Sequence, residues 1–309
     1  MNKIGVTQAV YTSDMDSLAC SIAYTELLNL EGKDATAYVP KDPAHSVTPE
    51  IKSWDFKYEI EPNEEDCKEM QFVLVDTTDP HTFPKFVNKD RIVEIYDHHM
   101  GYGSYWKERL GENAKIEMIG ACATLIWEEY KKRGFDQKIS QTSAKLLYAA
   151  IVSNTLNFKA SLTSPRDAQA FEELAPIAGI SKDWIQKYFI DQEEYIYQNT
   201  RQAILDDIKI IEFPNIGKKI PIGQIELWES KKFVTDYRPL IKEILDNFGY
   251  DRWFFNAPCI SMGKTYLLTE SEDIKSIFEK NFDFKFENDI GEVNRLIERK
   301  EFVKAILEL

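Results

Sequence analysis

Short apolar runs alternate with amphipathic helical runs in the first third of the chain. Between the first two runs, Ser17 can cap a helix, and apolar residues then recur at helical spacing from Leu18 to Leu28 until Gly32 ends it. This strand-helix-strand order is typical of a parallel sheet wrapped by helices. The predicted strands of this sheet are residues 3–11, 34–39, 71–75 and 91–96.

The middle of the chain has a mainly helical pattern. Apolar stripes at helical spacing cover residues 123–130, 144–152 and 168–178, with Gly134 and Gly179 as breaks between them. The polar and charged residues 191–207 that follow are predicted to form one exposed connecting helix.

Strands and helices alternate again towards the C-terminus, which predicts a second and smaller domain. The expected fold is α/β, with a parallel-sheet N-terminal domain (1–192), a linker (193–199) and a smaller mixed-sheet α/β C-terminal domain (200–309). The predicted strands of the second domain are residues 209–213, 220–227, 253–260 and 266–269, and its predicted helices are 234–247, 274–279 and 293–309.

The composition fits a folded, acidic protein. The 309 residues are 43% hydrophobic, and 38 Lys and Arg against 52 Asp and Glu give a net charge of −14. A chain of this length and apolar content can bury a full core, so disorder is excluded. The negative charge disfavours long nucleic acids and anionic membranes as partners, whereas a small anionic substrate stays open.

The cysteines predict neither disulfides nor a structural zinc site. Cys20, Cys67, Cys122 and Cys259 form no CxxC pair and have no histidine at zinc-finger spacing. Free thiols suit a reducing compartment, and no stretch approaches the eighteen apolar residues of a membrane span. We therefore expect a soluble protein of the cytoplasm.

Carboxylates follow three of the predicted strands. Asp14 and Asp16 come after the first, Asp76 after the third and Asp97 after the fourth. A single Asp at a strand end is usually a turn or cap residue, but the carboxyl ends of parallel strands converge on one ligand-binding crevice. Converging carboxylates repel one another unless a cation lies between them. Together they predict a divalent-cation site.

Two of the only four histidines, His98 and His99, directly follow Asp97. They could be ordinary surface residues of a loop. Neighbouring side chains of an extended segment point in opposite directions, so they can share a site only if the chain bends, which Gly101 and Gly103 would permit. One histidine would then be a metal ligand and the other an acid or base.

These residues form an ordered set of motifs that resembles the DHH phosphoesterase superfamily. The motifs are Asp14-Met-Asp16-Ser17, Val75-Asp76, Asp97-His98-His99 and Gly120-Ala-Cys-Ala-Thr124. Gln224-Ile-Glu226 and Arg299-Lys300 further resemble the DHHA2 branch, which contains manganese-dependent (family II) inorganic pyrophosphatases, exopolyphosphatases and prune-like phosphodiesterases. The resemblance implies a dinuclear centre of Mn²⁺ or Mg²⁺ in the first domain and a phosphate clamp from the second.

The resemblance also implies a role for each matching residue. Asp14 would bind one metal, Asp16 and His98 the other, and Asp76 would bridge both. His99 would act on the phosphate as an acid or polariser, supported by Asp97. The residues expected to bind phosphate from the second domain are Lys209, Arg299 and Lys300.

Two positions depart from the family pattern. Val10 stands where the pyrophosphatases have a metal-binding histidine, and Asn154 stands where the family has a metal-binding aspartate, although its carbonyl oxygen can still act as a ligand. Both changes weaken the expected metal site.

The sequence leaves several functions open. The main hypothesis is hydrolysis of a phosphoanhydride, in pyrophosphate or short polyphosphate, by metal-activated water. A nucleotide phosphoesterase, or a non-catalytic relative that binds phosphate or nucleotide, is the alternative, and Tyr102, Tyr105 and Trp106 could stack on a nucleoside instead of packing in the core. The superfamily also suggests a homodimer through an edge of the first domain.

Overall fold

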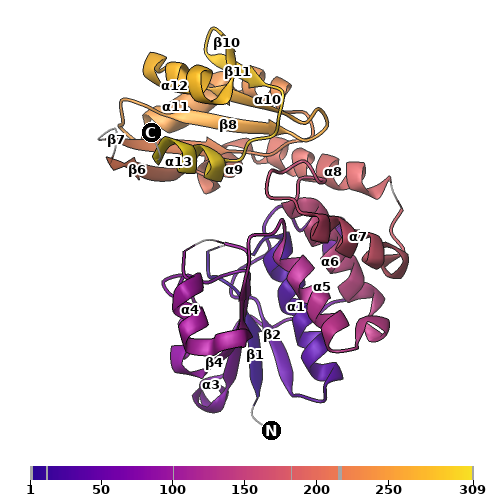
Figure 1. The fold of residues 1–309 in the computed structure, drawn as a ribbon. Coiled ribbons are helices and arrows are strands. Elements are labelled where there is room, and N and C mark those ends of the chain that lie inside the picture. The colour runs from indigo at the N-terminus through magenta and orange to yellow at the C-terminus, as the bar shows by residue number, and fades with distance from the viewer. Residues whose placement is uncertain (1–2, 12, 100, 182, 215–217, 308–309) are drawn as a thin grey trace. The chain divides into compact units, whose positions relative to one another are not determined.

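The computed structural model describes residues 3–11, 13–99, 101–181, 183–214 and 218–307, and the chain divides into two compact units (Figure 1). The first unit comprises Met1–Phe158 and Leu162–Trp184, and the second comprises Lys159–Ser161 and Ile185–Leu309. Residues 185–192, which the sequence places in the first domain, group with the second unit, and the linker expected at 193–199 is helical.

The first unit contains a five-stranded sheet in which every pair is parallel, as predicted. The strand order is β2-β1-β3-β4-β5, so the order reverses between β1 and β3, where ligands bind in sheets of this type. The short edge strand β5 was not predicted. The strands are β1 (Ile4–Thr7), β2 (Ala35–Tyr38), β3 (Gln71–Val75), β4 (Ile92–Asp97) and β5 (Ala114–Ile116).

Helices cover both faces of this sheet (Figure 1). Helices α1, α5 and α6 pack against one another, and α4 packs on β4 and β5. Asp14, rather than the predicted Ser17, caps α1, because its carboxylate accepts the backbone N–H of Ser17 at 3.0 Å. The helices are α1 (Met15–Leu30), α2 (Pro49–Lys52), α3 (Glu64–Glu69), α4 (Gly103–Leu110), α5 (Cys122–Lys132), α6 (Gln141–Asn154) and α7 (Pro165–Ala178).

The second unit contains a mixed sheet, as predicted, but with six strands instead of the four expected. Its order is β10-β11-β9-β8-β7-β6, with β7 and β8 parallel and the other pairs antiparallel. The strands are β6 (Lys209–Phe213), β7 (Lys218–Gln224), β8 (Phe254–Cys259), β9 (Lys264–Leu268), β10 (Lys285–Glu287) and β11 (Ile290–Val293).

Apolar clusters lie on both faces of this second sheet. Phe254 packs with Phe278 and Phe302 on one face, and Phe255 packs with Phe233 on the other. Consecutive strand residues point to opposite faces, so neighbouring aromatic residues of β8 contribute to the core on both faces of the sheet. The helices are α8 (Trp184–Gln198), α9 (Thr200–Asp206), α10 (Ser230–Asp236), α11 (Arg238–Asp246), α12 (Glu272–Phe282) and α13 (Arg299–Leu307).

The single connecting helix expected over 191–207 is divided at Asn199 into α8 and α9, and two further predicted helices differ from the observed ones. The helix expected over 293–309 begins only at Arg299, because Val293 ends strand β11 and pairs with Thr265. The helix expected over 234–247 is broken at Tyr237 into α10 and α11, and Pro239, which has no N–H to donate, lies at the start of α11. Among the described residues, no helix is long and apolar enough to cross a membrane.

Candidate metal centre

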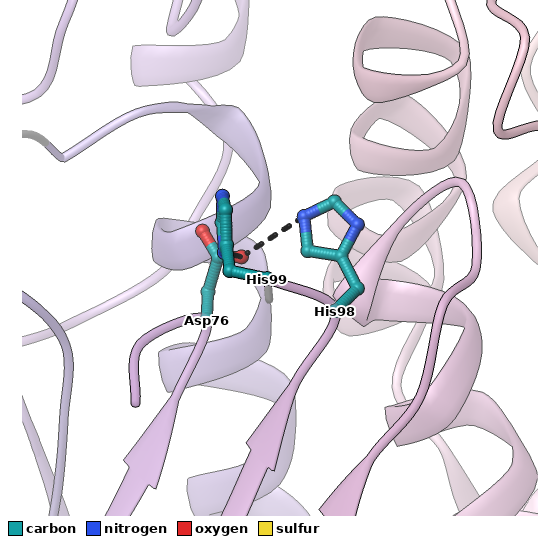
Figure 2. Close-up of side chains that lie close together, drawn as sticks. All are labelled: Asp76, His98 and His99. Carbon is teal, nitrogen blue, oxygen red and sulfur yellow. Dashed lines mark ion pairs between the residues drawn. The ribbon is translucent and has the colours of Figure 1, made fainter. Parts of the chain in front are cut away.

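The ends of β3 and β4 bring Asp76, His98 and His99 together, as Figure 2 shows. Asp76 Oδ1 lies 3.4 Å from His98 Nε2 and 3.7 Å from His99 Nδ1. Asp16, in the first turn of α1, reaches the same place, with Oδ2 at 3.8 Å from His98 Nε2. Four predicted site residues, distant in sequence, therefore converge at the carboxyl ends of the strands.

Asp76 is the most constrained residue of this group. Its φ of +56° lies in the left-handed region that side-chain-bearing residues rarely adopt, and such strain is concentrated at functional sites. Among the described residues, no hydrogen-bond donor meets its buried Oδ1 atom. Burial and the nearby charge of Asp16 raise the pKa of Asp76 to about 7. A buried carboxylate oxygen without a partner fits a cation ligand.

His98 is oriented as a metal ligand usually is. Its Nδ1 lies 2.9 Å from the carbonyl oxygen of Ile119, so Nδ1 carries the proton and Nε2 faces Asp16 and Asp76. Burial lowers the pKa of His98, but the neighbouring carboxylates of Asp76 and Asp16 raise it overall, to about 10. Without metal, a proton on His98 thus supplies the positive charge between the carboxylates.

Asp97 holds the backbone of both histidines and the ring of His99 by hydrogen bonds. It is fully buried, and its Oδ1 accepts the backbone N–H of His98 at 2.7 Å and of His99 at 3.1 Å, as well as His99 Nδ1 at 2.7 Å. Burial opposes a charge on His99, but Asp97 and then Asp76 raise its pKa overall. Because Nδ1 is held, Nε2 is the ring nitrogen of His99 left for a substrate.

Asp16 accepts hydrogen bonds at the N-terminus of α5. Its Oδ2 accepts the N–H of Cys122 at 2.7 Å, and its Oδ1 accepts the N–H of Ala123 at 2.8 Å. The positive end of the helix dipole favours a carboxylate there. Burial nevertheless raises the pKa of Asp16, and the charge of the half-buried Asp14 adds to this shift.

Asn154 and Val10 occupy the two positions that depart from the family pattern. Asn154 ends α6, and its Nδ2 donates to Asp16 and lies 3.5 Å from His98 Nε2. In this state the amide presents N–H groups to the site rather than the carbonyl oxygen we expected. Val10 is half-buried and donates its backbone N–H to Thr82 O at 2.9 Å. Its hydrocarbon side chain has no atom that can bind a metal.

The residues present fit a divalent cation. The ligand atoms of Asp76, His98 and His99 all lie within 4.8 Å of one another. Carboxylate oxygens and imidazole nitrogens are suitable ligands for manganese and related ions, and no hydrogen-bond donor among the described residues competes for Asp76 Oδ1.

The three predicted phosphate-binding residues belong to the second unit. Lys209 begins β6 and is exposed, whereas Arg299 and Lys300 begin α13. The buried Arg299 guanidinium donates to both carboxylate oxygens of Asp207, at 2.9 and 3.0 Å. Lys300 Nζ lies 3.1 Å from Glu298. Lys209 is therefore the most available cation of the three.

Residues around Arg299 include several that the sequence did not assign a role. Gln224 Oε1 accepts the backbone N–H of Arg299 and the Nδ2 of Asn256, the latter at 2.7 Å, while the amide of Gln224 donates to Glu226. Burial and the charge of Asp207 raise the pKa of Glu226 to about 7. The Gln224-Ile-Glu226 motif was a signal for this cluster, but nothing in the sequence pointed to Asp207.

Metal binding should depend on pH, because a metal ligand must lose its proton. His98, with its pKa raised to about 10, is protonated at pH 8, so we expect Mn²⁺ to displace about one proton there and to bind about tenfold more tightly per pH unit up to pH 9. Below about pH 7, Asp76 also holds a proton, so the Mn²⁺ affinity should change more steeply with pH there. Calorimetry in two buffers of different ionisation enthalpy measures the protons released. Affinity that is constant between pH 6 and 9 would contradict this assignment.

Known proteins are similar to this chain in sequence and in fold. Residues 6–151 match the DHH family, N-terminal domain. A manganese-dependent inorganic pyrophosphatase of Methanocaldococcus jannaschii is 30% identical over 259 residues, which cover 79% of this chain and 81% of the relative. A probable manganese-dependent inorganic pyrophosphatase of Lactobacillus acidophilus is 23% identical over 293 residues, covering 94% of this chain and 93% of the relative.

A solved structure agrees with these relatives in fold. A protein of Methanococcus jannaschii, provisionally assigned as a family II inorganic pyrophosphatase, superposes with a TM-score of 0.65 at 24% identity, covering 99% of this chain and 98% of the other. The chain belongs to the family of the manganese-dependent inorganic pyrophosphatases. The resemblance seen in the sequence is thereby confirmed.

Proposed function

We propose that this protein is a metal-dependent phosphohydrolase that cleaves the phosphoanhydride bond of inorganic pyrophosphate, with short polyphosphate as the second substrate. Its relatives named as manganese-dependent inorganic pyrophosphatases support the reaction. The observation that carries the proposal is the buried Oδ1 atom of Asp76, which lies beside both His98 and His99 and meets no hydrogen-bond donor among the described residues. A cation there would satisfy the oxygen and replace the His98 proton.

The proposed ligands of two divalent cations, Mn²⁺ or Mg²⁺, come from the first unit. Asp76 is the proposed bridge, and Asn154 can contribute only by turning its carbonyl oxygen towards the site. Bound cations supply a water of lowered pKa and positive charge for the phosphoryl oxygens. The remaining proposed ligands are Asp14, Asp16 and His98.

His99 has the proposed role of acid towards the leaving phosphate. Asp97 holds its Nδ1 and raises its pKa, which favours the protonated ring that would offer a proton from Nε2. This hydrogen bond fixes the direction in which Nε2 points, as general acid catalysis requires. Asp97 is therefore proposed as the support of the acid.

Lys209, Arg299 and Lys300 are the proposed cations for the substrate phosphates. The surrounding chain desolvates Lys209 and, with the charge of Arg299, lowers the pKa of Lys209. Arg299 is held by Asp207, so a phosphate must compete with this carboxylate or bind beside it.

Replacing Lys209 with glutamine should raise the KM for pyrophosphate about tenfold and lower kcat less, because the lysine contacts both bound substrate and transition state. Steady-state phosphate release measures both constants. Lys219→Gln is the matched control, since Lys219 is exposed on the neighbouring strand and lies 3.5 Å from Glu212. Equal KM values for the two variants would remove Lys209 from the phosphate site.

A substrate panel tests the proposed reaction. Phosphate release is measured with Mn²⁺ on pyrophosphate, tripolyphosphate, ATP and a nucleoside monophosphate. The proposal expects the highest kcat/KM on pyrophosphate. Preference for a nucleotide would favour the phosphoesterase alternative, and binding without turnover on all four would favour a non-catalytic phosphate-binding protein.

Trp106 is fully buried and donates to Thr78 O at 2.7 Å, so this ring is not free to stack on a nucleoside.

The proposed setting is the cytoplasm, with a homodimer as the assembly. All four cysteines are free, which suits a reducing compartment. The edge strands of the first sheet are β2 and β5, and pairing through one of them would join two copies. Sedimentation velocity distinguishes a dimer from the 35.9 kDa monomer.

A further inference from the structure

We propose that Asp167 is a positioning residue for the metal centre: it holds residues 119–123 in the conformation that orients Asp16 and His98. This inference rests on the proposed function, because it concerns the same metal site. Asp167 lies in the first turn of α7 and is not one of the proposed ligands. Nothing in the motifs that carry the family resemblance includes it.

The Asp167 carboxylate is fully buried and is surrounded by hydrogen-bond donors. Its Oδ2 accepts the N–H of Gly120 at 3.0 Å and both the N–H and the hydroxyl of Ser164 at 2.8 Å. Its Oδ1 accepts the N–H of Ala121 at 3.2 Å and the hydroxyl of Thr124 at 2.7 Å. A helix cap alone would need only the bonds to Ser164, so the other three are available for a second task.

The segment that Asp167 holds also contacts the metal centre directly. The carbonyl oxygen of Ile119 fixes Nδ1 of His98, and the N–H groups of Cys122 and Ala123 bind the two oxygens of Asp16. Both metal-site residues are therefore oriented by backbone atoms of one short segment. A shift of this segment would turn the His98 ring and the Asp16 carboxylate together.

The N-terminus of α5 depends on these two aspartates. Ala121 is at the N-cap, and its methyl side chain cannot accept a hydrogen bond. Instead, Asp167 binds the N–H groups of residues 120 and 121, and Asp16 binds those of 122 and 123. If Asp167 lost its charge, Asp16 would be the remaining carboxylate bound to these four groups, and the helix end could pull it away from the metal.

Gly120 shows how closely the segment is fitted to Asp167. A Cβ at this position would lie 2.7 Å from Asp167 Oδ2 and 2.8 Å from Thr155 Cγ2, which is closer than real Cβ contacts allow. Only glycine lets the backbone approach the carboxylate this closely. A substitution at Gly120 should therefore disturb the metal site in the same way as one at Asp167.

Asp167→Asn is the main test. The amide keeps the size of the side chain but places an N–H group against donors, so the segment must move. Substitution of a residue that supports a metal ligand typically lowers metal affinity by about 10–100-fold. We therefore expect Asp167→Asn to lower the Mn²⁺ affinity by about 10-fold or more. The electron paramagnetic resonance signal of free Mn²⁺ measures binding without any turnover.

Glu26→Gln is the matched control. Glu26 accepts the N–H and hydroxyl of Ser140 and the hydroxyl of Ser143 at the start of α6, so it is a capping carboxylate of the same kind outside the segment. This variant should keep wild-type Mn²⁺ affinity. In metal-free protein, the ¹⁵N chemical shifts of the His98 ring should move in Asp167→Asn and stay unchanged in Glu26→Gln.

The outcomes separate this inference from the proposed function. If wild type binds Mn²⁺ and Asp167→Asn binds it equally well with unchanged His98 shifts, Asp167 is only a helix cap. If wild type binds no Mn²⁺, the proposed function fails, and the His98 shifts of metal-free protein still decide the role of Asp167. Should Asp167→Asn not fold, Thr124→Val removes one hydroxyl donor and should weaken Mn²⁺ binding severalfold. Unchanged affinity and unchanged His98 shifts there would equally overturn the inference.

Discussion

Asp76→Ala and Asp76→Asn are each expected to lower phosphate release from pyrophosphate about 10³-fold or more, which corresponds to about 4 kcal/mol of the barrier. Asp76 supplies the buried oxygen that lies 3.4 Å from His98 Nε2 and 3.7 Å from His99 Nδ1, and no hydrogen-bond donor meets it among the described residues. Asparagine tolerates the left-handed backbone of residue 76 better than alanine does, so it removes the charge with less strain.

Steady-state kinetics at saturating Mn²⁺ measure this loss. Asp90→Ala removes an exposed carboxylate that pairs with Arg109 on the surface and should leave the rate unchanged. If both Asp76 variants kept more than about a tenth of the wild-type rate, Asp76 could not be the bridging ligand. Loss in the alanine variant with retention in the asparagine variant would assign the effect to backbone strain instead.

Asn154→Asp is expected to strengthen Mn²⁺ binding about 10–100-fold. The amide of Asn154 now donates to Asp16 and lies beside Nε2 of His98, so a carboxylate there would replace a donor with a charged ligand. Without metal, the added charge lies next to Asp16 and should lower the thermal stability of the protein. The variant should therefore gain more stability from Mn²⁺ than wild type does.

Calorimetric titration and thermal unfolding with and without Mn²⁺ measure these changes. Asn247→Asp is the control, because Asn247 is an exposed residue at the end of α11, and both substitutions place an acid at a helix C-terminus. Equal Mn²⁺ affinity in wild type and Asn154→Asp would show that residue 154 lies outside the coordination sphere. The Asn247 variant separates the effect of the helix end from that of the metal site.

The sequence predicted most of the first sheet because its central strands are short apolar runs between turn signals. Residues 71–75 form β3 as predicted, with four of the five residues buried. The edge strand β5 was missed because its three residues are only half-buried and show no apolar run. In the second unit, strands β10 and β11 were missed because they are also short. They form a hairpin with a turn at Asn288, whose φ is +56°.

The position of the site was predictable, but the hydrogen bonds around it were not. Residues at the carboxyl ends of parallel strands meet at one edge, so the convergence of Asp76 and His98 follows from topology alone. The pairing of Arg299 with Asp207 joins residues 92 positions apart, and the bonds of Asp167 to residues 120 and 121 join positions 47 and 46 apart. Such contacts depend on tertiary packing, for which the local sequence carries no signal.

The protein is expected to hydrolyse pyrophosphate only when Asp76 and His98 hold metal, and one titration tests this most directly. Mn²⁺ is added stepwise to chelator-treated protein while bound metal and phosphate release are measured on the same sample. We predict that two ions bind per chain, that release is absent without metal, and that it rises as the sites fill. Full occupancy without phosphate release, or equal release without metal, would contradict the account.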